Sequence, residues 1–105
     1  MTDYVQVSTT ASDRDAAMTL VRSAVAARLA ASGQVIGPVE SVFWHAGQLG
    51  EGQEWQIVLR TTMAKYPELE RHLIDVHPWD NPEVTFTRLA GGSAPYLEWI
   101  ERTTA

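Results

Sequence analysis

The chain has 105 residues, of which 45% are hydrophobic and 20% charged, values typical of one folded domain. Its 13 acidic and 8 basic residues give a formal net charge of -5, and this acidic balance argues against nucleic acid as a partner. Because the sequence contains no cysteine, disulfides, thiolate catalysis and cysteine-ligated zinc are excluded. No apolar run approaches the ~18–20 residues of a membrane span, and the first residues lack the pattern of a signal peptide. We therefore expect a single domain over residues 1–105, located in the cytoplasm and without a membrane partner.

The first third of the chain predicts a strand followed by a long helix. Tyr4–Thr10 alternates and is rich in residues that favour strands. Ser12 and Asp15 have the spacing of a capping box, and apolar residues then recur every three to four positions, as on the buried face of a helix. Gly33 stands where a glycine is expected just past the helix end. The expected helix has about 20 residues and a length of ~30 Å.

The middle of the chain predicts a hairpin. An extended region over 35–44 is interrupted by Gly37 and Pro38. Since proline has no N–H to donate to a neighbouring strand, we expect an edge strand or a bulge at this point. The glycine-rich segment 47–52 predicts the turn, and 54–62 is the strongest strand pattern in the chain.

The last third predicts a helix, a loop, a strand and a short helix. The second helix starts near Pro67, which is tolerated in a first turn, and continues to Val76. Two prolines make 77–82 a loop, 84–89 alternates as a strand, and 96–100 forms a C-terminal helix. The order βαββαβ with a terminal helix predicts an α+β, ferredoxin-like fold, in which both main helices cover one face of a four-stranded sheet.

The three histidines are the candidates for metal or proton chemistry, and none lies in a dense ligand motif. His72 lies within the second helix, where a solvated position explains it. His45 can pair across the hairpin with Glu54, an interpretation that we favour over metal binding. For His77, a capping role at the helix end and a functional role both stay open, because an aromatic and acidic segment starts at Trp79.

The sequence shows no pattern of an enzyme active site. The glycines lie at turns rather than between a strand and a helix, so no phosphate-binding loop is expected. The hydroxyls of Ser8, Thr9 and Thr10 lack the GxSxG context of a nucleophile. Because no nucleophile, base and orienting group can be assembled, we expect a protein that is not an enzyme.

Five segments carry a family resemblance. The most specific is His77-Pro78-Trp79-Asp80-Asn81-Pro82-Glu83-Val84, which is similar to the pattern HPYxxPE with Trp in place of Tyr. Residues 96–100 are similar to a C-terminal YLxW, and residues 54–61 to a strand that ends in Lys-Thr, with Arg in place of Lys. Residues 47–49 and 10–13 fit a hairpin and the end of a first strand. Each match is weak alone, but in this order they resemble the CutA family, named for divalent cation tolerance, along nearly the whole chain.

The resemblance implies a ferredoxin-like fold, a tight homotrimer and a role in divalent cation tolerance. The family's proposed copper site uses a cysteine of the first strand and the histidine of the HP motif. Here Thr9 stands at the cysteine position, and Ser32 stands where a further cysteine is usual after the long helix. His77 remains, with Glu83 as a nearby oxygen ligand, so Cu²⁺ or Zn²⁺ is expected to bind weakly or not at all.

A second function stays open beside the CutA-like one. The trimeric PII-like regulatory proteins share this architecture and hold small ligands in clefts between subunits. If the chain is such a module, the residues expected to line the ligand cleft are Thr9, His45, Glu54, Arg60 and Trp79.

The tryptophans predict where subunits meet. With a turn centred between Leu49 and Gly50, Trp44 lies opposite Trp55, so two indoles share one face of the hairpin and would be exposed in a monomer. The terminal helix offers a second apolar surface. Pairing between subunits would also cover the two unpaired edges of the sheet. The residues expected at the trimer interface are Trp44, Trp55, Tyr96 and Trp99.

Overall fold

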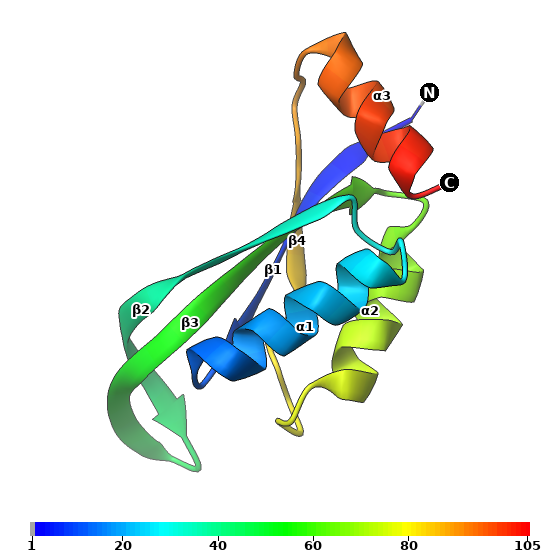
Figure 1. Cartoon of the computed structure of the whole chain (residues 1–105). Helices are drawn as coiled ribbons and strands as arrows, with labels where there is room; N and C mark the ends of the chain where they lie inside the picture. Colours follow the sequence, from blue (N-terminus) through cyan, green and yellow to red (C-terminus); the bar gives the residue numbers. More distant parts are fainter. Residues whose placement is uncertain (1) are drawn as a thin grey trace.

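The computed structural model describes residues 2–105 and shows one antiparallel sheet with three helices (Figure 1). The elements in chain order are β1 (Tyr4–Ala11), α1 (Arg14–Ala26), β2 (Ser32–His45), β3 (Gln48–Thr62), α2 (Tyr66–Val76), β4 (Thr85–Arg88) and α3 (Ala94–Thr103). The strand order in the sheet is β2-β3-β1-β4, and every pair of neighbours is antiparallel. The predicted α+β order βαββαβ with a C-terminal helix is confirmed.

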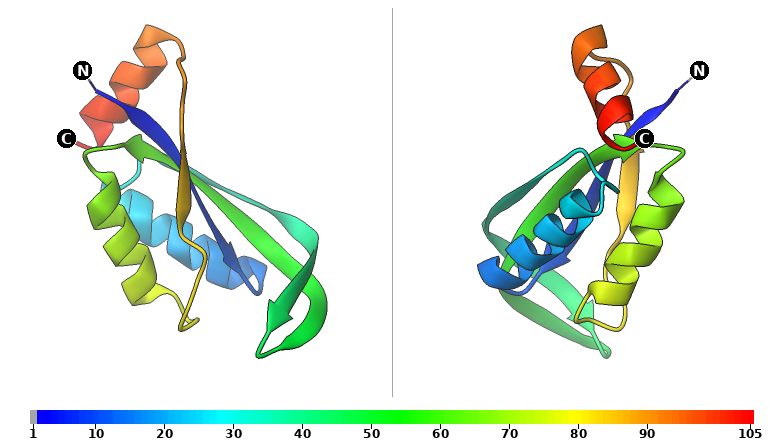
Figure 2. Two further views of the ribbon diagram at one scale, coloured as in Figure 1. Left: turned by 180° about the vertical axis from the view of Figure 1, so that it is seen from behind. Right: turned by 45° about the vertical axis from the view of Figure 1, so that its right-hand side comes forward.

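Helices α1 and α2 lie side by side on one face of the sheet, and α3 lies at the end of the sheet near the N-terminus (Figures 1 and 2). The pattern of β1 explains why one face of the sheet is covered by helices. Its residues are alternately buried and half-buried, and the buried apolar ones belong to the core. The core between sheet and helices includes the large side chains of Val5, Val7, Ile57, Leu59, Leu20, Leu69 and Leu73.

The opposite face of the sheet has no helix lying across it, as the view from behind shows (Figure 2, left). We call it the open face. The register of the three strand pairs places these residues on it: Tyr4, Gln6, Ser8, Thr10, Ser32, Gln34, Ile36, Glu54, Gln56, Val58, Arg60, Thr62, Thr85 and Thr87.

Helix α1 differs from the prediction at both ends. Its N-cap is Asp13, whose carboxylate accepts the N–H of Ala16 at 2.8 Å, rather than Ser12. It ends at Ala26 after 13 residues, and the chain then turns through Arg28, which has a φ of 59°. Gly33 is not a helix cap but a residue of β2. A Cβ on Gly33 would lie 2.6 Å from Leu59, so the glycine permits close packing of strand and core instead.

The hairpin turn is shorter than the predicted segment 47–52 and lies nearer to the start of the chain. It consists of Ala46 and Gly47, both with positive φ (51° and 77°), which is the backbone of a tight two-residue turn. Glycines 50 and 52 belong to β3. As a consequence Trp44 lies opposite Leu49 rather than Trp55.

The interruption at Gly37 and Pro38 is confirmed as an irregularity in an edge strand. The register of β2 against β3 shifts between Ile36 and Val39, and β2 is the outer strand of the sheet. The ring of Trp55 fills the space beside Gly37, where a Cβ would lie 2.6 Å from it. No helix among residues 2–105 is long and apolar enough to cross a membrane.

Candidate functional site

His77 follows α2 directly and is almost fully buried, with 7% of its surface exposed. Its Nε2 lies 2.7 Å from the carbonyl oxygen of Thr10, and its Nδ1 lies 3.1 Å from the backbone nitrogen of Trp79. A carbonyl only accepts and an amide N–H only donates, so the hydrogen of the ring sits on Nε2 and the lone pair of Nδ1 is used. His77 thus joins the end of β1 to the loop after α2, and its ring contacts that of Trp79 at a centroid distance of 5.0 Å.

The residues around His77 do not fit a divalent metal ion within one chain. Both ring nitrogens are hydrogen-bonded to the backbone, so none has a lone pair to offer. The carboxylate of Glu83 accepts the hydroxyl of Thr85 at 2.9 Å. Within residues 2–105, no three His, Asp or Glu side chains come together as a metal site. The role of His77 and Glu83 as ligands stays a prediction, and their geometry argues against it.

His72 is not simply solvated. It is half-buried, and its Nε2 lies 2.6 Å from the hydroxyl oxygen of Ser23, so the pair connects α2 to α1. A mostly apolar cavity of about 310 Å³ lies beside Ser23 and is lined by Ala16, Thr19, Leu20, Ser23, Val76 and Pro78. The sequence carried no signal for this contact, because its two residues are 49 positions apart.

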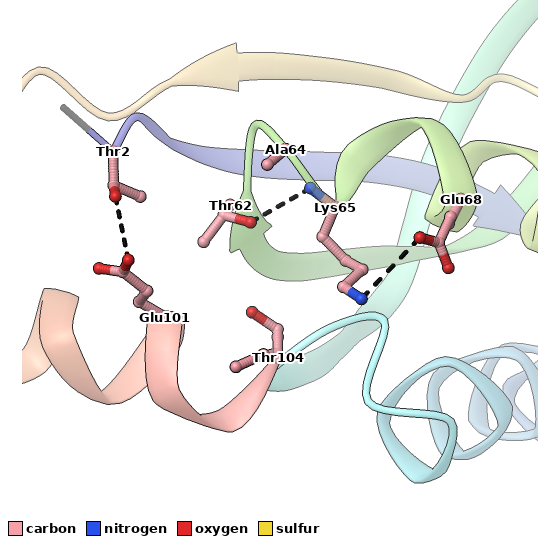
Figure 3. A pocket seen from close by; sticks show the side chains of 8 residues that line it. Thr2, Thr62, Ala64, Lys65, Glu68, Glu101 and Thr104 are labelled. Atoms are coloured by element: carbon pink, nitrogen blue, oxygen red, sulfur yellow. Dashed lines mark hydrogen bonds and ion pairs between the residues drawn. The ribbon is translucent and has the colours of Figure 1, made fainter.

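A second cavity, also of about 310 Å³, lies where the start of β1, the β3–α2 turn and α3 meet, and three charged residues are among those that line it (Figure 3). On one side Glu101 accepts the hydroxyl of Thr2 at 3.1 Å, and on the other Lys65 Nζ lies 3.9 Å from Glu68. Burial and the hydrogen bond to Glu101 raise the pKa of Tyr4 above its usual value. Glu101 is hydrogen-bonded to Thr2 and Tyr4, and Lys65 lies near Glu68. The contacts of Glu101 therefore connect α3 to the start of β1.

The five residues expected to line a ligand cleft do not meet within one chain. Thr9 faces the helices and is 1% exposed, whereas Arg60 lies on the open face. His45 is at the exposed hairpin turn and pairs with Gln48, so its expected contact with Glu54 is wrong. Glu54 pairs instead with Val39, beside the register shift of β2.

Two residues of that set, Thr9 and Trp79, are linked indirectly through His77. The ring of His77 binds the carbonyl of Thr10, next to Thr9, and the backbone of Trp79. A cleft formed by all five residues would require neighbouring subunits, and it stays a prediction.

The residues expected at the trimer interface differ in how much one chain covers them. Trp44 is 74% exposed and Tyr96 41% exposed. Trp55 is half-buried against the core, and Trp99 is half-buried with its ring 5.7 Å from that of Tyr96. The indole pair predicted for the hairpin therefore does not form.

Trp44 instead forms an exposed apolar surface with its neighbours at the end of the hairpin. The strand register places Val42, Trp44 and Leu49 on one face of the ribbon, and Val42 and Leu49 are 64% and 63% exposed. We call these three residues the hairpin tip. Exposed apolar clusters of this kind mark interaction surfaces.

Comparison with known proteins identifies one family, and the match covers nearly the whole chain. Residues 5–103 match the model of the CutA1 divalent ion tolerance protein family. The Divalent-cation tolerance protein CutA of Thermus thermophilus is 29% identical over 95 residues, which cover 90% of this chain and 92% of that protein. Protein CutA 1, chloroplastic, of Oryza sativa is 29% identical over 100 residues, and the match covers 95% of this chain but only 56% of the rice protein.

A solved structure agrees in both fold and sequence. The CutA1 of the psychrotrophic bacterium Shewanella sp. SIB1 superposes with a TM-score of 0.92 and 31% identity, covering 96% of this chain and 94% of that one. The order of the strands, the loop around His77 and the matched sequence over residues 5–103 thus point to one conclusion: the chain belongs to the CutA1 divalent ion tolerance protein family.

Proposed function

We propose that the protein is a cytoplasmic, non-enzymatic homotrimer that acts in divalent cation tolerance and binds Cu²⁺ or Zn²⁺ weakly or not at all. Family membership supports the role in tolerance. The single observation that carries the statement on metal is the placement of His77, whose two ring nitrogens are both hydrogen-bonded to the backbone.

The chemistry of the donors supports weak binding. The chain has no cysteine, so a soft thiolate ligand is absent, and Thr9 offers only a buried hydroxyl. A metal ion that used His77 would have to displace either the carbonyl of Thr10 or the N–H of Trp79. Leaving such a group unpaired inside the protein costs about 1–3 kcal/mol, which would be subtracted from the binding free energy.

Calorimetric titration with Cu²⁺ and Zn²⁺ tests this proposal, using the wild type, His77→Ala and the matched control His45→Ala. We expect His77→Ala to lower the free energy of unfolding by about 2–3 kcal/mol, because two hydrogen bonds of a buried ring are lost. Metal affinity should stay weak and unchanged in all three proteins. A nanomolar copper site that disappears in His77→Ala but persists in His45→Ala would contradict the proposal.

The trimer is supported by two features of the single chain. The hairpin tip exposes apolar side chains that a second copy could cover. The outer strands β2 and β4 each have an edge that no strand among residues 2–105 covers, and strand pairing between copies would cover both edges.

The alternative function, a PII-like regulatory module with a ligand between subunits, depends on the same assembly. The five expected cleft residues are dispersed in one chain, so only a trimer could bring them together. Adding nucleotides to the titrations separates the two functions. Nucleotide binding by the trimer, lost when Trp79 is replaced by Ala, would favour the regulatory module.

A further inference from the structure

The mostly apolar cavity beside Ser23 lies between α1 and the end of α2, in the helix layer that covers the sheet opposite to the open face. Leu20 lines it from α1 and is only 2% exposed, whereas Val76 lines it from α2 and is 43% exposed, so the cavity reaches the surface. Its volume is about 310 Å³. Since a cavity of about 150 Å³ accommodates a benzene ring, this one has room for a molecule of two fused rings.

The lining of this cavity selects an uncharged ligand. Its polar side chains are the hydroxyls of Thr19 and Ser23, and within the described part of the chain no charged residue lines it. An ion placed against these walls would lose water without gaining a counter-ion, which is costly. A neutral molecule would lose little, and it would cover the exposed apolar surface of Val76.

Both hydroxyls of the cavity have already donated their hydrogens to the protein. Thr19 donates to the carbonyl oxygen of Asp15 at 3.0 Å. Ser23 Oγ lies 2.6 Å from His72 Nε2, which is shorter than the ~2.7–3.2 Å usual between an N–H donor and oxygen and within the ~2.5–3.0 Å of hydroxyl donors, so Ser23 is the donor. A hydroxyl that has donated its hydrogen keeps two lone pairs. The cavity therefore offers hydrogen-bond acceptors, and a ligand that fits it must bring the donor.

We propose that this cavity binds a neutral, apolar molecule of two fused rings that carries one N–H or O–H group, which donates to Ser23 Oγ. Small-molecule sites combine apolar walls with a few polar groups that fix the orientation of the ligand, and this cavity has that composition. The site goes beyond the proposed function, because it needs neither a metal ion nor a cleft between subunits.

The affinity of such a small ligand comes mainly from apolar contact, with one neutral hydrogen bond added. For a ligand of about nine non-hydrogen atoms we expect a dissociation constant of about 1 mM. Because neither partner in this contact is charged, the affinity should change little with ionic strength.

Titration of the wild type with indole, followed by NMR chemical shifts, tests the proposal. Indole has two fused rings and one N–H, and benzofuran has nearly the same shape with an oxygen in place of the N–H. Because benzofuran cannot donate to Ser23, it should bind about three- to ten-fold more weakly than indole. Benzofuran that binds as tightly as indole would overturn the assignment of a donor ligand.

The variant Ser23→Ala removes the acceptor. It should weaken indole binding about three- to ten-fold and leave benzofuran binding unchanged. The control is Ser93→Ala, which changes an exposed serine before α3 whose side chain forms no capping bond, and it should affect neither ligand. Equal indole binding by the wild type and Ser23→Ala would overturn the proposal.

Two further measurements locate the ligand if Ser23→Ala does not fold. Methyl signals of Ala16, Leu20 and Val76 in the wild type should shift on addition of indole, and shifts confined to the hairpin tip would refute the site. Ala16→Leu fills the cavity and should abolish binding, whereas Ala27→Leu, at an exposed position just past α1, should retain it. Indole that binds Ala16→Leu as tightly as the wild type would also refute the site.

Discussion

At the scale of single residues, the interior of the protein contains two polar groups without a partner. The hydroxyls of Thr9 and Thr61 are buried and form no hydrogen bond among residues 2–105. Thr9 faces the helices from β1, and Thr61 does so from the end of β3, opposite Val5. His77 differs from the two threonines, because each of its ring nitrogens forms a hydrogen bond. The buried polar atoms of His77 therefore have hydrogen-bond partners, whereas the buried hydroxyls of Thr9 and Thr61, on the two inner strands of the sheet, have none among the described residues.

Replacing either buried threonine by valine should stabilise the protein. Valine has nearly the same shape and no hydroxyl to desolvate, so Thr9→Val and Thr61→Val are each expected to raise the free energy of unfolding by about 1 kcal/mol. Chemical denaturation measures the change. The exposed strand residue Thr87, changed to Val, is the control and should shift stability by less than ~0.5 kcal/mol. A loss of stability in Thr9→Val would show that its hydroxyl has a partner in the assembled protein.

At the scale of the elements, glycines decide how closely β2 approaches its neighbours. An added Cβ on Gly33 would lie 2.6 Å from Leu59 and 2.7 Å from Val21, whereas on Gly52 it would meet nothing within 4 Å. Glycine thus permits close packing at position 33 and has no steric role at position 52.

This contrast gives a matched pair of variants. Gly33→Ala forces a methyl group between α1 and the sheet and should cost about 1–3 kcal/mol of stability. Gly52→Ala should be neutral or stabilise by up to roughly 1 kcal/mol, because a strand glycine loses more backbone entropy on folding than alanine. Thermal unfolding of both variants beside the wild type measures the difference. Equal stability of the two would mean that α1 moves away from Gly33 at little cost.

The hairpin turn offers a second test at this scale. Ala46 has a φ of 51°, a left-handed conformation that costs an ordinary residue about 1–2 kcal/mol and that asparagine tolerates better. Ala46→Asn creates the Asn-Gly pair that two-residue turns prefer, so we expect a gain of roughly 1 kcal/mol. Ala90→Asn, in an exposed segment after β4, is the control and should give no gain. The denaturant midpoints of the wild type and both variants measure these changes in stability. A lower stability of Ala46→Asn would contradict the turn geometry.

At the scale of the whole molecule, the chain is elongated. Its principal extents are 44 × 25 × 21 Å, and its radius of gyration is 14.3 Å. A compact domain of this length has a radius of gyration of ~13 Å. The long hairpin of β2 and β3 projects away from the helices and accounts for the excess (Figure 1). A single chain does not cover the end of this projection, and its apolar residues are the reason to expect an assembly.

The hairpin tip supplies the corresponding prediction. Trp44→Glu places a charge in the proposed interface and should weaken the trimer about ten-fold or more, because an unpaired charge would have to be buried. Trp44→Phe keeps an aromatic ring there and should retain the trimer. Light scattering at micromolar concentration gives the mass of each protein. A wild type that stays at the mass of one chain, 11.6 kDa, would refute the assembly itself.

Many features of this protein were predictable from local patterns in the sequence. The alternation of β1, the helical spacing of α2, the prolines after Val76 and the irregularity at Gly37 all act within a few residues, and each was found where it was expected. The helical spacing of α1 predicted a helix in the right place, but the helix is shorter than expected. The five matching segments, taken together and in order, indicated the family, because runs of specific residues can be recognised before any contact is known.

Tertiary structure alone decided which residues meet. The position of the turn at Ala46 set the pairing of the whole hairpin, and a shift of a few residues there separated Trp44 from Trp55 and His45 from Glu54. The partners of His77, Ser23 and Glu101 lie 67, 49 and 99 residues away. Periodicity shows which side of a strand or helix is buried, but contacts between distant segments depend on strand register and helix packing. For that reason the sequence determined the elements and the family, and the fold determined that His77 is bound to the backbone and Arg60 is left on the open face.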